Sequence, residues 1–331
     1  MAEVTLRGTT KQFGSTVAVD DLSMTTPDGA FVVLLGPTGA GKTTTLRLIA
    51  GLEQPDAGEI EIGGRSVLGL TPAQRDVAMV FQQYSLYPHM TVRENLAFPL
   101  RSPVLETPEQ EIKRKVGEVA ETLKISHKLD NKATALSGGE MQRVSIGRAL
   151  VRDPSIYLMD EPLSSLDAKL RSDLRIELKR VQASLGATLL YVTHDQIEAM
   201  TMATQVGVLE QGRLVQFGTP REIYEDPVSL TVAGRLGLPR INALPADLFG
   251  SAPPRACTIG LRPEHIEQGE GLLSEVVRVE HLGDQTRLHL SLAGHDIITL
   301  TSVHTDLTPG ATVAIRPRNA LYFDASGARV A

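Results

Sequence analysis

Short runs of apolar residues recur along the first two thirds of the chain, and each is followed by a polar or glycine-rich segment. Four of these runs are almost wholly apolar, as expected for strands buried on both faces of a parallel sheet. They span residues 31–35, 77–81, 156–159 and 188–192. Because stretches with helical spacing of apolar residues lie between them, the pattern predicts an α/β domain.

Four helices are predicted where apolar residues recur at helical spacing between capping residues. They span residues 42–50, about 107–125, 141–151 and 168–185. The second has Thr107 as its expected cap, Pro108 at its first position and Gln110 three residues after the cap. Because this helix belongs to a mostly helical stretch, residues of about 84–150 are expected to form a helical subdomain inserted into the sheet domain.

Alternating apolar and polar residues predict antiparallel strands in two further places. Residues 4–7 and 59–62 are expected to lie side by side, and residues 206–217 to form a hairpin with a turn at Gly212. Beyond a linker at residues 233–245, short strands separated by turn residues predict a small β-barrel. These strands span residues 257–261, 275–279, 286–292, 297–300, 312–315 and 321–323.

The chain has 331 residues, more than one typical domain, so two domains are the default expectation. Its formal net charge of −6 argues against nucleic acid as an obligate partner. The single cysteine, Cys257, cannot form an internal disulfide, and nothing near it suggests a metal site. The first residues lack the character of a signal peptide, and no run of about 18 apolar residues occurs. We therefore expect a soluble, cytosolic chain that serves a membrane only through partners.

Residues 36–43 match the phosphate-binding pattern G-x-x-x-x-G-K-[ST] at every fixed position. They lie between a predicted strand and a predicted helix, where backbone N–H groups and the helix N-terminus favour a bound anion. Lys42 is expected to reach the β- and γ-phosphates of a nucleotide, and the Thr43 hydroxyl to bind its Mg²⁺. The alternative is a glycine-rich turn without a ligand.

Polar residues follow three of the predicted buried strands, at the sheet edge where ligands collect in open α/β sheets. Gln82 is predicted to ligate Mg²⁺ and to orient a water, although a solvated loop glutamine is a common alternative. Asp160 and Glu161 suggest a division of labour, in which Asp160 faces the metal and Glu161 is the general base. His194 is a third polar group at this edge, although a lone histidine is usually structural.

Two further features suggest contacts with a nucleotide. Residues 137–140, Ser-Gly-Gly-Glu, precede a predicted helix, which makes their backbone N–H groups a second potential anion site. A bare Ser-Gly-Gly sequence also occurs in many linkers. Phe13 is a candidate surface for stacking a base, with ordinary core packing as an equal alternative.

In sequence order these motifs resemble those of the ATP-binding-cassette ATPases over residues 1 to about 232. The resemblance rests on GPTGAGKTT at 36–44, Gln82, LSGGE at 136–140, the strand ending in Asp160 and Glu161, the S-x-L-D loop at 164–167 and His194. It implies a P-loop NTPase cassette over residues 1–234, with a RecA-like core, an antiparallel β subdomain and a helical subdomain. The later sequences GLPRINALPADLF, IGLRPEHI and LGDQT resemble the regulatory region of the maltose-importer type. They imply an OB-fold-like (TOBE-like), all-β regulatory domain over residues 235–331.

The resemblance also implies the roles of individual residues. The catalytic residues that it implies are Glu161, His194 and Gln82. The metal ligands that it implies are Thr43, Gln82 and Asp160. The nucleotide contacts are Phe13, Gly36, Pro37, Thr38, Gly39, Ala40, Gly41, Lys42, Thr43, Thr44, Ser137, Gly138, Gly139 and Glu140. The chain departs from common family residues at Phe13 (more often Tyr), Ala40 (Ser or Cys), Thr43 (Ser) and Glu140 (Gln).

The family implies an ATP hydrolase that works as a homodimer or close heterodimer, with the phosphate loop of one subunit and residues 137–139 of the other closing on one ATP. It implies a peripheral subunit at the cytoplasmic face of a bacterial inner membrane, partnered by two permease subunits and indirectly by an external solute-binding protein. Residues 84–98 are the expected coupling surface. The solute stays open among sugars, polyols, glycosides and, less favoured, glycerol phosphate.

Two other functions were weighed against this one. The first is a cassette ATPase that acts on nucleic acid or the ribosome. It is disfavoured because no long arm of heptad repeats interrupts the cassette and the sequence has no strongly basic tract. The second is a sugar- or RNA-binding barrel that the cassette regulates.

Overall fold

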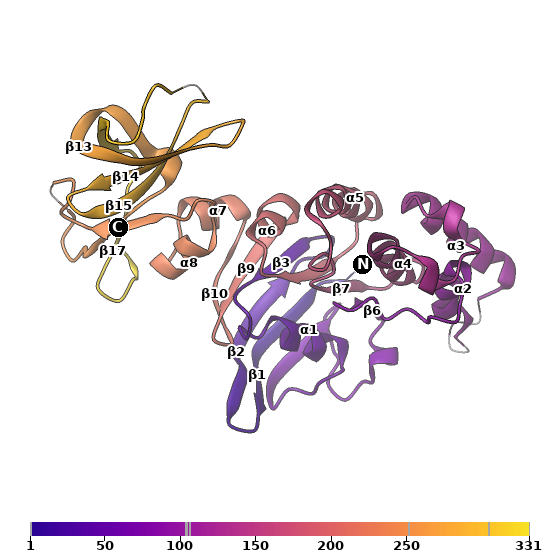
Figure 1. The fold of residues 1–331 in the computed structure, drawn as a ribbon. Coiled ribbons are helices and arrows are strands. Elements are labelled where there is room, and N and C mark those ends of the chain that lie inside the picture. The colour runs from indigo at the N-terminus through magenta and orange to yellow at the C-terminus, as the bar shows by residue number, and fades with distance from the viewer. Residues whose placement is uncertain (1, 103–104, 106, 251, 304, 331) are drawn as a thin grey trace. The chain divides into compact units, whose positions relative to one another are not determined.

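The computed structural model describes residues 2–102, 105, 107–250, 252–303 and 305–330. The chain divides into two compact units, Met1–Pro220 and Arg221–Ala331, whose elements can be followed by colour and label in Figure 1. This division falls earlier in the chain than the functional boundary expected between residues 234 and 235, which stays a prediction.

A six-stranded sheet forms the centre of the first unit, in the order β10-β9-β3-β8-β7-β6. Its strands are β3 (Phe31–Leu35), β6 (Val77–Val80), β7 (Ile156–Asp160), β8 (Leu189–Thr193), β9 (Gln205–Glu210) and β10 (Arg213–Gly218). All neighbours pair in parallel except β9 and β10, which form the predicted hairpin. The four predicted buried strands are confirmed, although β6 ends before Phe81, whose side chain is 38% exposed.

Alternate residues of the central strands face two different layers, because side chains alternate across a strand. Val32 and Leu34 of β3 share a core with Leu46 of α1 (Lys42–Ala50). Figure 1 shows α1 on one side of the sheet and α5 (Ala168–Leu185) and α6 (Gln196–Met202) on the other. The sheet is thus covered on both faces, as its apolar strands require.

A second, antiparallel sheet packs against α1 in the order β2-β1-β4-β5. Its strands are β1 (Val4–Phe13), β2 (Thr16–Thr26), β4 (Ala57–Ile62) and β5 (Arg65–Ser66). The predicted pairing of the first strand with residues 59–62 is confirmed, with Val4 opposite Ile62. The length of β1 and the existence of β2 were missed. Shifts of register between Leu6 and Gln12 explain the omission, because bulges break the alternation on which the prediction rests.

Helices make up much of residues 84–150. They are α2 (Val92–Ala97), α3 (Glu109–Thr122), α4 (Gly138–Leu150) and the 3₁₀ turns Phe98–Arg101, Ser126–Lys128 and Ala133–Ala135. The expected cap of α3 at Thr107 is wrong, because the capping position is held by Pro108, which offers no side-chain acceptor. The helix also ends before residue 125, since Lys124 adopts a left-handed backbone conformation with φ 56°. Among the described residues, none of the helices combines the length and the apolar character of a membrane span.

The second unit opens with helices and continues as strands. α7 (Pro220–Glu225) and α8 (Leu230–Arg235) precede two antiparallel four-stranded sheets, in the orders β11-β12-β17-β18 and β15-β14-β13-β16. The strands are β11 (Asn242–Pro245), β12 (Thr258–Leu261), β13 (Ile266–His281), β14 (Thr286–Leu292), β15 (His295–Thr301), β16 (Thr312–Pro317), β17 (Leu321–Phe323) and β18 (Arg329–Val330). The all-β prediction is confirmed. The linker prediction for residues 233–245 is partly wrong, because β11 and the end of α8 lie in it.

Candidate active site

The phosphate loop, residues 36–43, joins the carboxyl end of β3 to α1. Lys42 is buried, and its Nζ donates hydrogen bonds of 2.9 Å to the carbonyl oxygens of Gly36 and Pro37. Gly41 has a φ of 96°, and a Cβ at this position would lie 2.4 Å from the carbonyl oxygen of Ala18, so the position requires glycine. The first N–H groups of α1 receive no side-chain cap from the described residues, which leaves them suited to an anion.

Burial decreases toward the tip of this loop. The buried members are Gly36, Ala40, Gly41 and Lys42, the half-buried ones are Pro37, Thr43 and Thr44, and the exposed ones are Thr38 and Gly39. The backbone of the tip is therefore accessible to a phosphate group, while the lysine that neutralises its charge is held from within.

Thr43 and Asp160 are joined directly, although 117 positions separate them. The Thr43 hydroxyl donates a hydrogen bond of 2.8 Å to Oδ1 of Asp160, the last residue of β7. Burial raises the pKa of the Asp160 carboxyl, and the carboxylate of Glu161 raises it further, while the bond from Thr43 opposes both. A nearby cation would favour the ionised form of this carboxyl.

Mg²⁺ fits this pair of oxygen donors, because it binds through one or two carboxylates and completes its shell with water and phosphate oxygens. No group of three or more His, Cys, Asp and Glu side chains in the described part of the chain is arranged to hold a metal ion by itself. A cation at Thr43 and Asp160 therefore needs further oxygens from a bound nucleotide.

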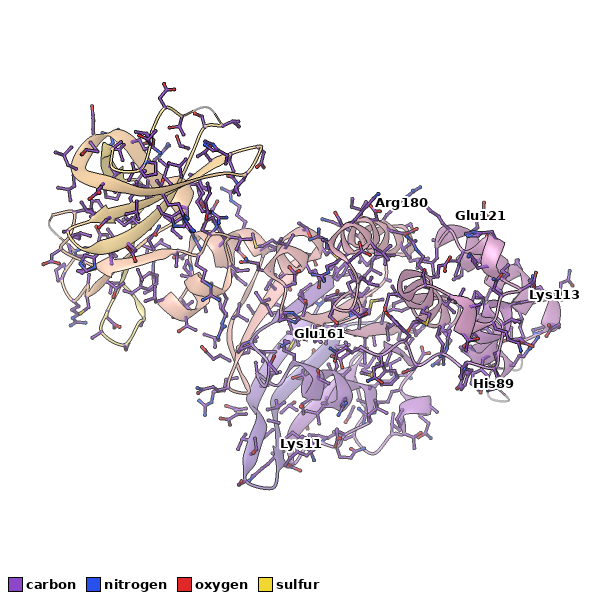
Figure 2. All side chains as sticks on the ribbon, viewed as in Figure 1. Lys11, His89, Lys113, Glu121, Glu161 and Arg180 are labelled. Atoms are coloured by element: carbon purple, nitrogen blue, oxygen red, sulfur yellow. The ribbon has the colours of Figure 1, made fainter. Side chains whose placement is uncertain are left out.

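Glu161 lies between a cation and an imidazole. Its Oε1 is 3.9 Å from Nζ of Lys42, and its Oε2 is 3.1 Å from Nδ1 of His194. Its backbone is left-handed, with a φ of 44°, which is uncommon outside glycine and typical of functional sites. The Glu161 N–H donates a hydrogen bond of 3.1 Å to the carbonyl of Val192, which fixes this turn beside β8. Figure 2 shows Glu161 amid the sheet and helices of the first unit, away from the edge where Lys113 lies.

Gln82 and Phe13 are joined to this cluster by no hydrogen bond or ion pair among the described residues. Gln82 is exposed in the bend that follows β6, the strand beside β7. Phe13 ends β1 with its side chain 46% exposed, and the ammonium of Lys11 lies 5.2 Å from its ring centroid. Core packing therefore does not explain Phe13, and its stacking on a base stays a prediction.

Residues 137–140 form the start of α4 and satisfy one another. Glu140 accepts a hydrogen bond of 2.8 Å from the Ser137 N–H, and the Ser137 hydroxyl caps the N–H of Glu140. The bond from the Ser137 backbone lowers the pKa of Glu140, and Nζ of Lys128 lies 3.0 Å from its other oxygen. Glutamate at this position is thus a helix-capping acid with its own counterion. Within the described residues, no hydrogen bond or ion pair joins residues 137–140 to Lys42 or Glu161.

The structure adds a buried carboxylate that the sequence analysis missed. Glu198 of α6 is 2% exposed, and its Oε2 accepts hydrogen bonds of 2.8 Å from Tyr191 Oη and 2.7 Å from Thr193 Oγ1. A signal was present, because hydroxyl groups inside a buried strand require acceptors nearby. Sequence alone did not show which acidic residue supplies one.

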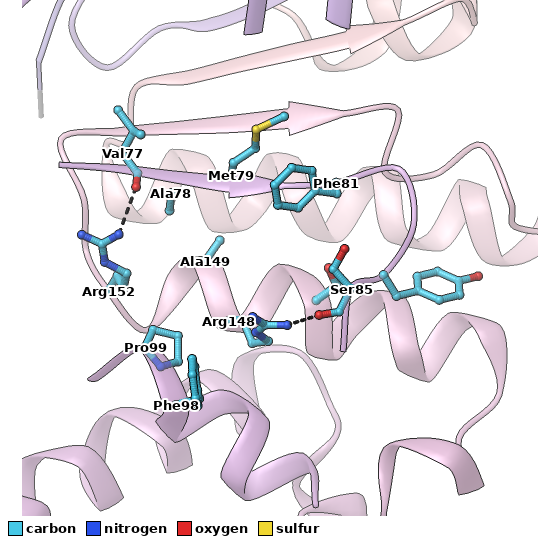
Figure 3. Close-up of a pocket in the computed structure, with 12 residues that line it drawn as sticks. Val77, Ala78, Met79, Phe81, Ser85, Phe98, Pro99, Arg148, Ala149 and Arg152 are labelled. Carbon is cyan, nitrogen blue, oxygen red and sulfur yellow. Dashed lines mark hydrogen bonds between the residues drawn. The ribbon is translucent and has the colours of Figure 1, made fainter. Parts of the chain in front are cut away.

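A pocket of about 230 Å³ lies between β6 and α4 (Figure 3). Phe81 and Phe98 contribute apolar surface, and their side chains are 38% and 43% exposed. Two arginines also line it: Arg148 of α4 donates to the carbonyl of Ser85, and Arg152 donates a hydrogen bond of 3.0 Å to the carbonyl of Val77. The pocket therefore combines exposed aromatic rings with anchored arginines.

Two family models match the chain. One, described as ABC transporter, matches residues 19–164, and the other, described as TOBE domain, matches residues 259–322. The sn-glycerol-3-phosphate import ATP-binding protein of Ruegeria sp. (strain TM1040) is 45% identical, and the alignment covers 100% of each chain. The lactose transport ATP-binding protein of Rhizobium radiobacter is 42% identical, also over 100% of each. The trehalose/maltose import ATP-binding protein of Thermococcus litoralis is 45% identical over 89% of each.

Solved structures resemble part of the chain. A dimeric ATP-binding cassette in a post-hydrolysis state, bound to ADP and phosphate, is 30% identical with a TM-score of 0.59, covering 66% of this chain and 99% of that one. A cassette of an ABC transporter in its ADP conformation is 27% identical with a TM-score of 0.62, covering 70% of this chain and 98% of that one.

Proposed function

The chain belongs to the ABC transporter family as an ATP-binding subunit, and on that premise we propose that it hydrolyses ATP to power import of a carbohydrate or related polar solute. The observation that carries the proposal is the convergence of Lys42, Thr43, Asp160, Glu161 and His194 at the carboxyl edge of one sheet. Relatives named for import, aligned with 100% and 89% of this chain, support the direction of transport.

The phosphate loop binds the nucleotide in this proposal. Its backbone N–H groups and the start of α1 face the phosphates, and Lys42 stabilises the negative charge on the β- and γ-phosphates. The remaining loop residues, from Gly36 to Thr44, hold the backbone in this shape. Phe13 offers its exposed ring to the base.

Glu161 is the proposed general base, which takes a proton from the water that attacks the γ-phosphate. Lys42 and His194 hold its carboxylate from two sides, so its direction is fixed before the reaction. His194 is 59% exposed and is proposed to contact the γ-phosphate as well. Gln82, at the end of the neighbouring strand, is proposed to orient the water.

Thr43, Asp160 and Gln82 are the proposed ligands of Mg²⁺, which neutralises phosphate charge when it is bound. The contact of 2.8 Å between Thr43 and Asp160 supports this role, because it brings two oxygen donors together. The raised pKa of Asp160 supports it too, since the carboxyl gains a favourable partner for its charge.

A second copy of the chain, or a close relative, is proposed to complete each site. Residues 137–140 present a helix N-terminus but are not joined to the phosphate loop of their own chain. One chain therefore carries two anion-binding helix starts and one lysine-bearing loop. A dimer that shares two nucleotides between two chains uses all of them, and a two-fold axis closes such an arrangement.

The pocket between β6 and α4 is proposed to receive a segment of a membrane-embedded permease subunit. Exposed aromatic rings and arginines are typical of the centres of protein interfaces, and Phe81, Phe98 and Arg148 supply both. Residues 84–98 frame this pocket as the coupling surface. In this arrangement the chain is a peripheral subunit at the cytoplasmic face of the membrane, with two permease subunits as direct partners and a solute-binding protein as an indirect one.

The proposed solutes are sugars, polyols and glycosides, with glycerol phosphate as a further member of the class. Relatives named for lactose, trehalose and maltose, and sn-glycerol-3-phosphate support this range. Affinity purification from detergent-solubilised membranes tests the proposal: two integral membrane proteins are expected in the complex, and ribosomal proteins or RNA in their place would overturn it. Uptake of labelled lactose, maltose and glycerol phosphate by a deletion strain then separates the solutes.

A further inference from the structure

We propose that Glu198 is a positioning residue for ATP hydrolysis, which holds His194 against Glu161 from inside the protein. The inference rests on the proposed function of this site, and it assigns a role to a buried residue outside the proposed nucleotide and metal contacts. Glu198 acts through the backbone on both sides of His194.

The residue that precedes His194 is anchored by Glu198. The side chains of Tyr191, Thr193 and Glu198 are almost wholly buried, and one carboxylate oxygen accepts both hydroxyl groups, at 2.8 Å and 2.7 Å. Thr193 Oγ1 in turn accepts a hydrogen bond of 3.0 Å from the N–H of Asp195. The carboxylate therefore fixes the last turn of backbone before and after His194.

The residue that follows His194 is anchored twice more. Asp195 caps α6 by accepting hydrogen bonds from the N–H groups of Ile197 and Glu198, at 2.7 Å and 3.3 Å. Its other oxygen lies 3.4 Å from Arg171, which also donates a bond of 2.8 Å to the carbonyl of Leu166. The start of α6 is thus tied to the loop that follows Glu161.

His194 itself has no such packing. Its side chain is 59% exposed, and its one side-chain hydrogen bond among the described residues is the contact of 3.1 Å with Oε2 of Glu161. An exposed ring samples several rotamers, so its alignment depends on where the backbone places it. Without the Glu198 carboxylate, two buried hydroxyls lose their acceptor and the segment between β8 and α6 gains freedom to shift.

Steady-state ATP hydrolysis by the purified chain, assayed with Mg²⁺, tests this role. Glu198→Ala is expected to lower kcat on the order of 10- to 100-fold, as small misplacements of catalytic groups do, with the KM for ATP within about twofold of the parent. Glu198→Gln is the matched control, because its amide oxygen accepts the same two bonds, and it is expected to restore most of kcat. Thr193→Val, which has the same shape, is a second variant for use if Glu198→Ala does not fold, and it is expected to lower kcat as well.

Combination with His194→Ala separates positioning from a general loss of structure. If Glu198 acts through His194, adding Glu198→Ala to His194→Ala lowers kcat no further. Parental kcat in both Glu198→Ala and Thr193→Val overturns the inference, as does an additive loss in the double variant. Failure of the proposed function looks different: the parent then hydrolyses no ATP, or His194→Ala alone leaves kcat unchanged.

Discussion

The ammonium of Lys42 lies 3.9 Å from Oε1 of Glu161, so the proposed phosphate-binding cation and the proposed general base face each other across the end of the sheet. Lys42 is the better buried of the two, and backbone carbonyls hold it within its loop. Changes at either residue therefore act on the same site but on different steps, which makes the pair a direct test of the mechanism.

Lys42→Ala is expected to abolish ATP hydrolysis and to weaken ATP binding severely, because it removes the cation that faces the phosphates. Fluorescent nucleotide titration and a phosphate-release assay measure the two effects separately. Lys113→Ala, at an exposed lysine of α3, is a suitable control and should leave both near the parental level. Turnover by Lys42→Ala close to that of the parent would contradict the assignment of the phosphate loop.

Glu161→Gln is expected to keep ATP binding but to lower hydrolysis on the order of 10²- to 10⁴-fold, since it preserves shape while removing the base. The ATP-bound dimer should then persist, because the nucleotide is not consumed and a negative charge beside it is gone. Size-exclusion chromatography with ATP measures the dimer. A variant that hydrolyses ATP at the parental rate shows that another group is the base, and one that stays monomeric at saturating ATP shows that pairing requires the permease.

Glu140 provides a test of stability rather than of catalysis. Glu140→Gln keeps an oxygen acceptor for the Ser137 N–H, whereas Glu140→Ala removes it together with the contact to Lys128. The alanine variant is expected to unfold with about 0.5–1.5 kcal/mol less free energy than the glutamine variant. Urea denaturation compares them. Equal stabilities would show that the capping box contributes little to α4.

Burial raises the pKa of Glu198 from its usual 4.5, and this shift predicts a pH-dependent difference between the parent and Glu198→Gln. The folded state binds this proton more tightly than the unfolded state, so the contribution of Glu198 to stability is complete below pH 4.5 and is lost as pH rises through the raised pKa. As the pH rises from 4.5 through the raised pKa of Glu198, the parent should therefore lose unfolding free energy relative to Glu198→Gln. Unfolding free energies measured from pH 4.5 to pH 8 test this, and a difference that grows toward low pH contradicts it.

A chain that ends at Pro220 is expected to bind ATP as the full chain does, because every proposed nucleotide contact lies before that residue. A chain that ends at Arg235 should also bind ATP but aggregate more. It keeps α8, whose Leu230 and Ala233 pack against Ile241, Leu321 and Phe323. Circular dichroism, light scattering and nucleotide titration compare the two. A folded 1–220 chain without ATP binding would show that the second unit contributes to the site.

Local patterns predicted a large part of this architecture because the relevant signals are short in range. The buried strands β3, β7 and β8 are apolar runs, although β7 and β8 end in the polar residues Asp160 and Thr193. α1 and α5 end at Gly51 and Gly186 as expected. Where the local pattern is broken the prediction failed. The bulged strands β1 and β2 were mostly missed. Thr107 was predicted to be the N-terminal cap of α3, a position that Pro108 holds in the structure.

The sequence by itself determined the family, the phosphate loop and the polar residues at the ends of the strands, because each of these is a fixed spacing of residue types. Only the tertiary structure decided how they meet. The hydrogen bond from Thr43 to Asp160 and the contact of Glu161 with His194 depend on β3, β8 and β7 being neighbours, and strand order is set by long-range packing. The same holds for Glu198, whose role depends on α6 folding back onto the buried hydroxyls of β8.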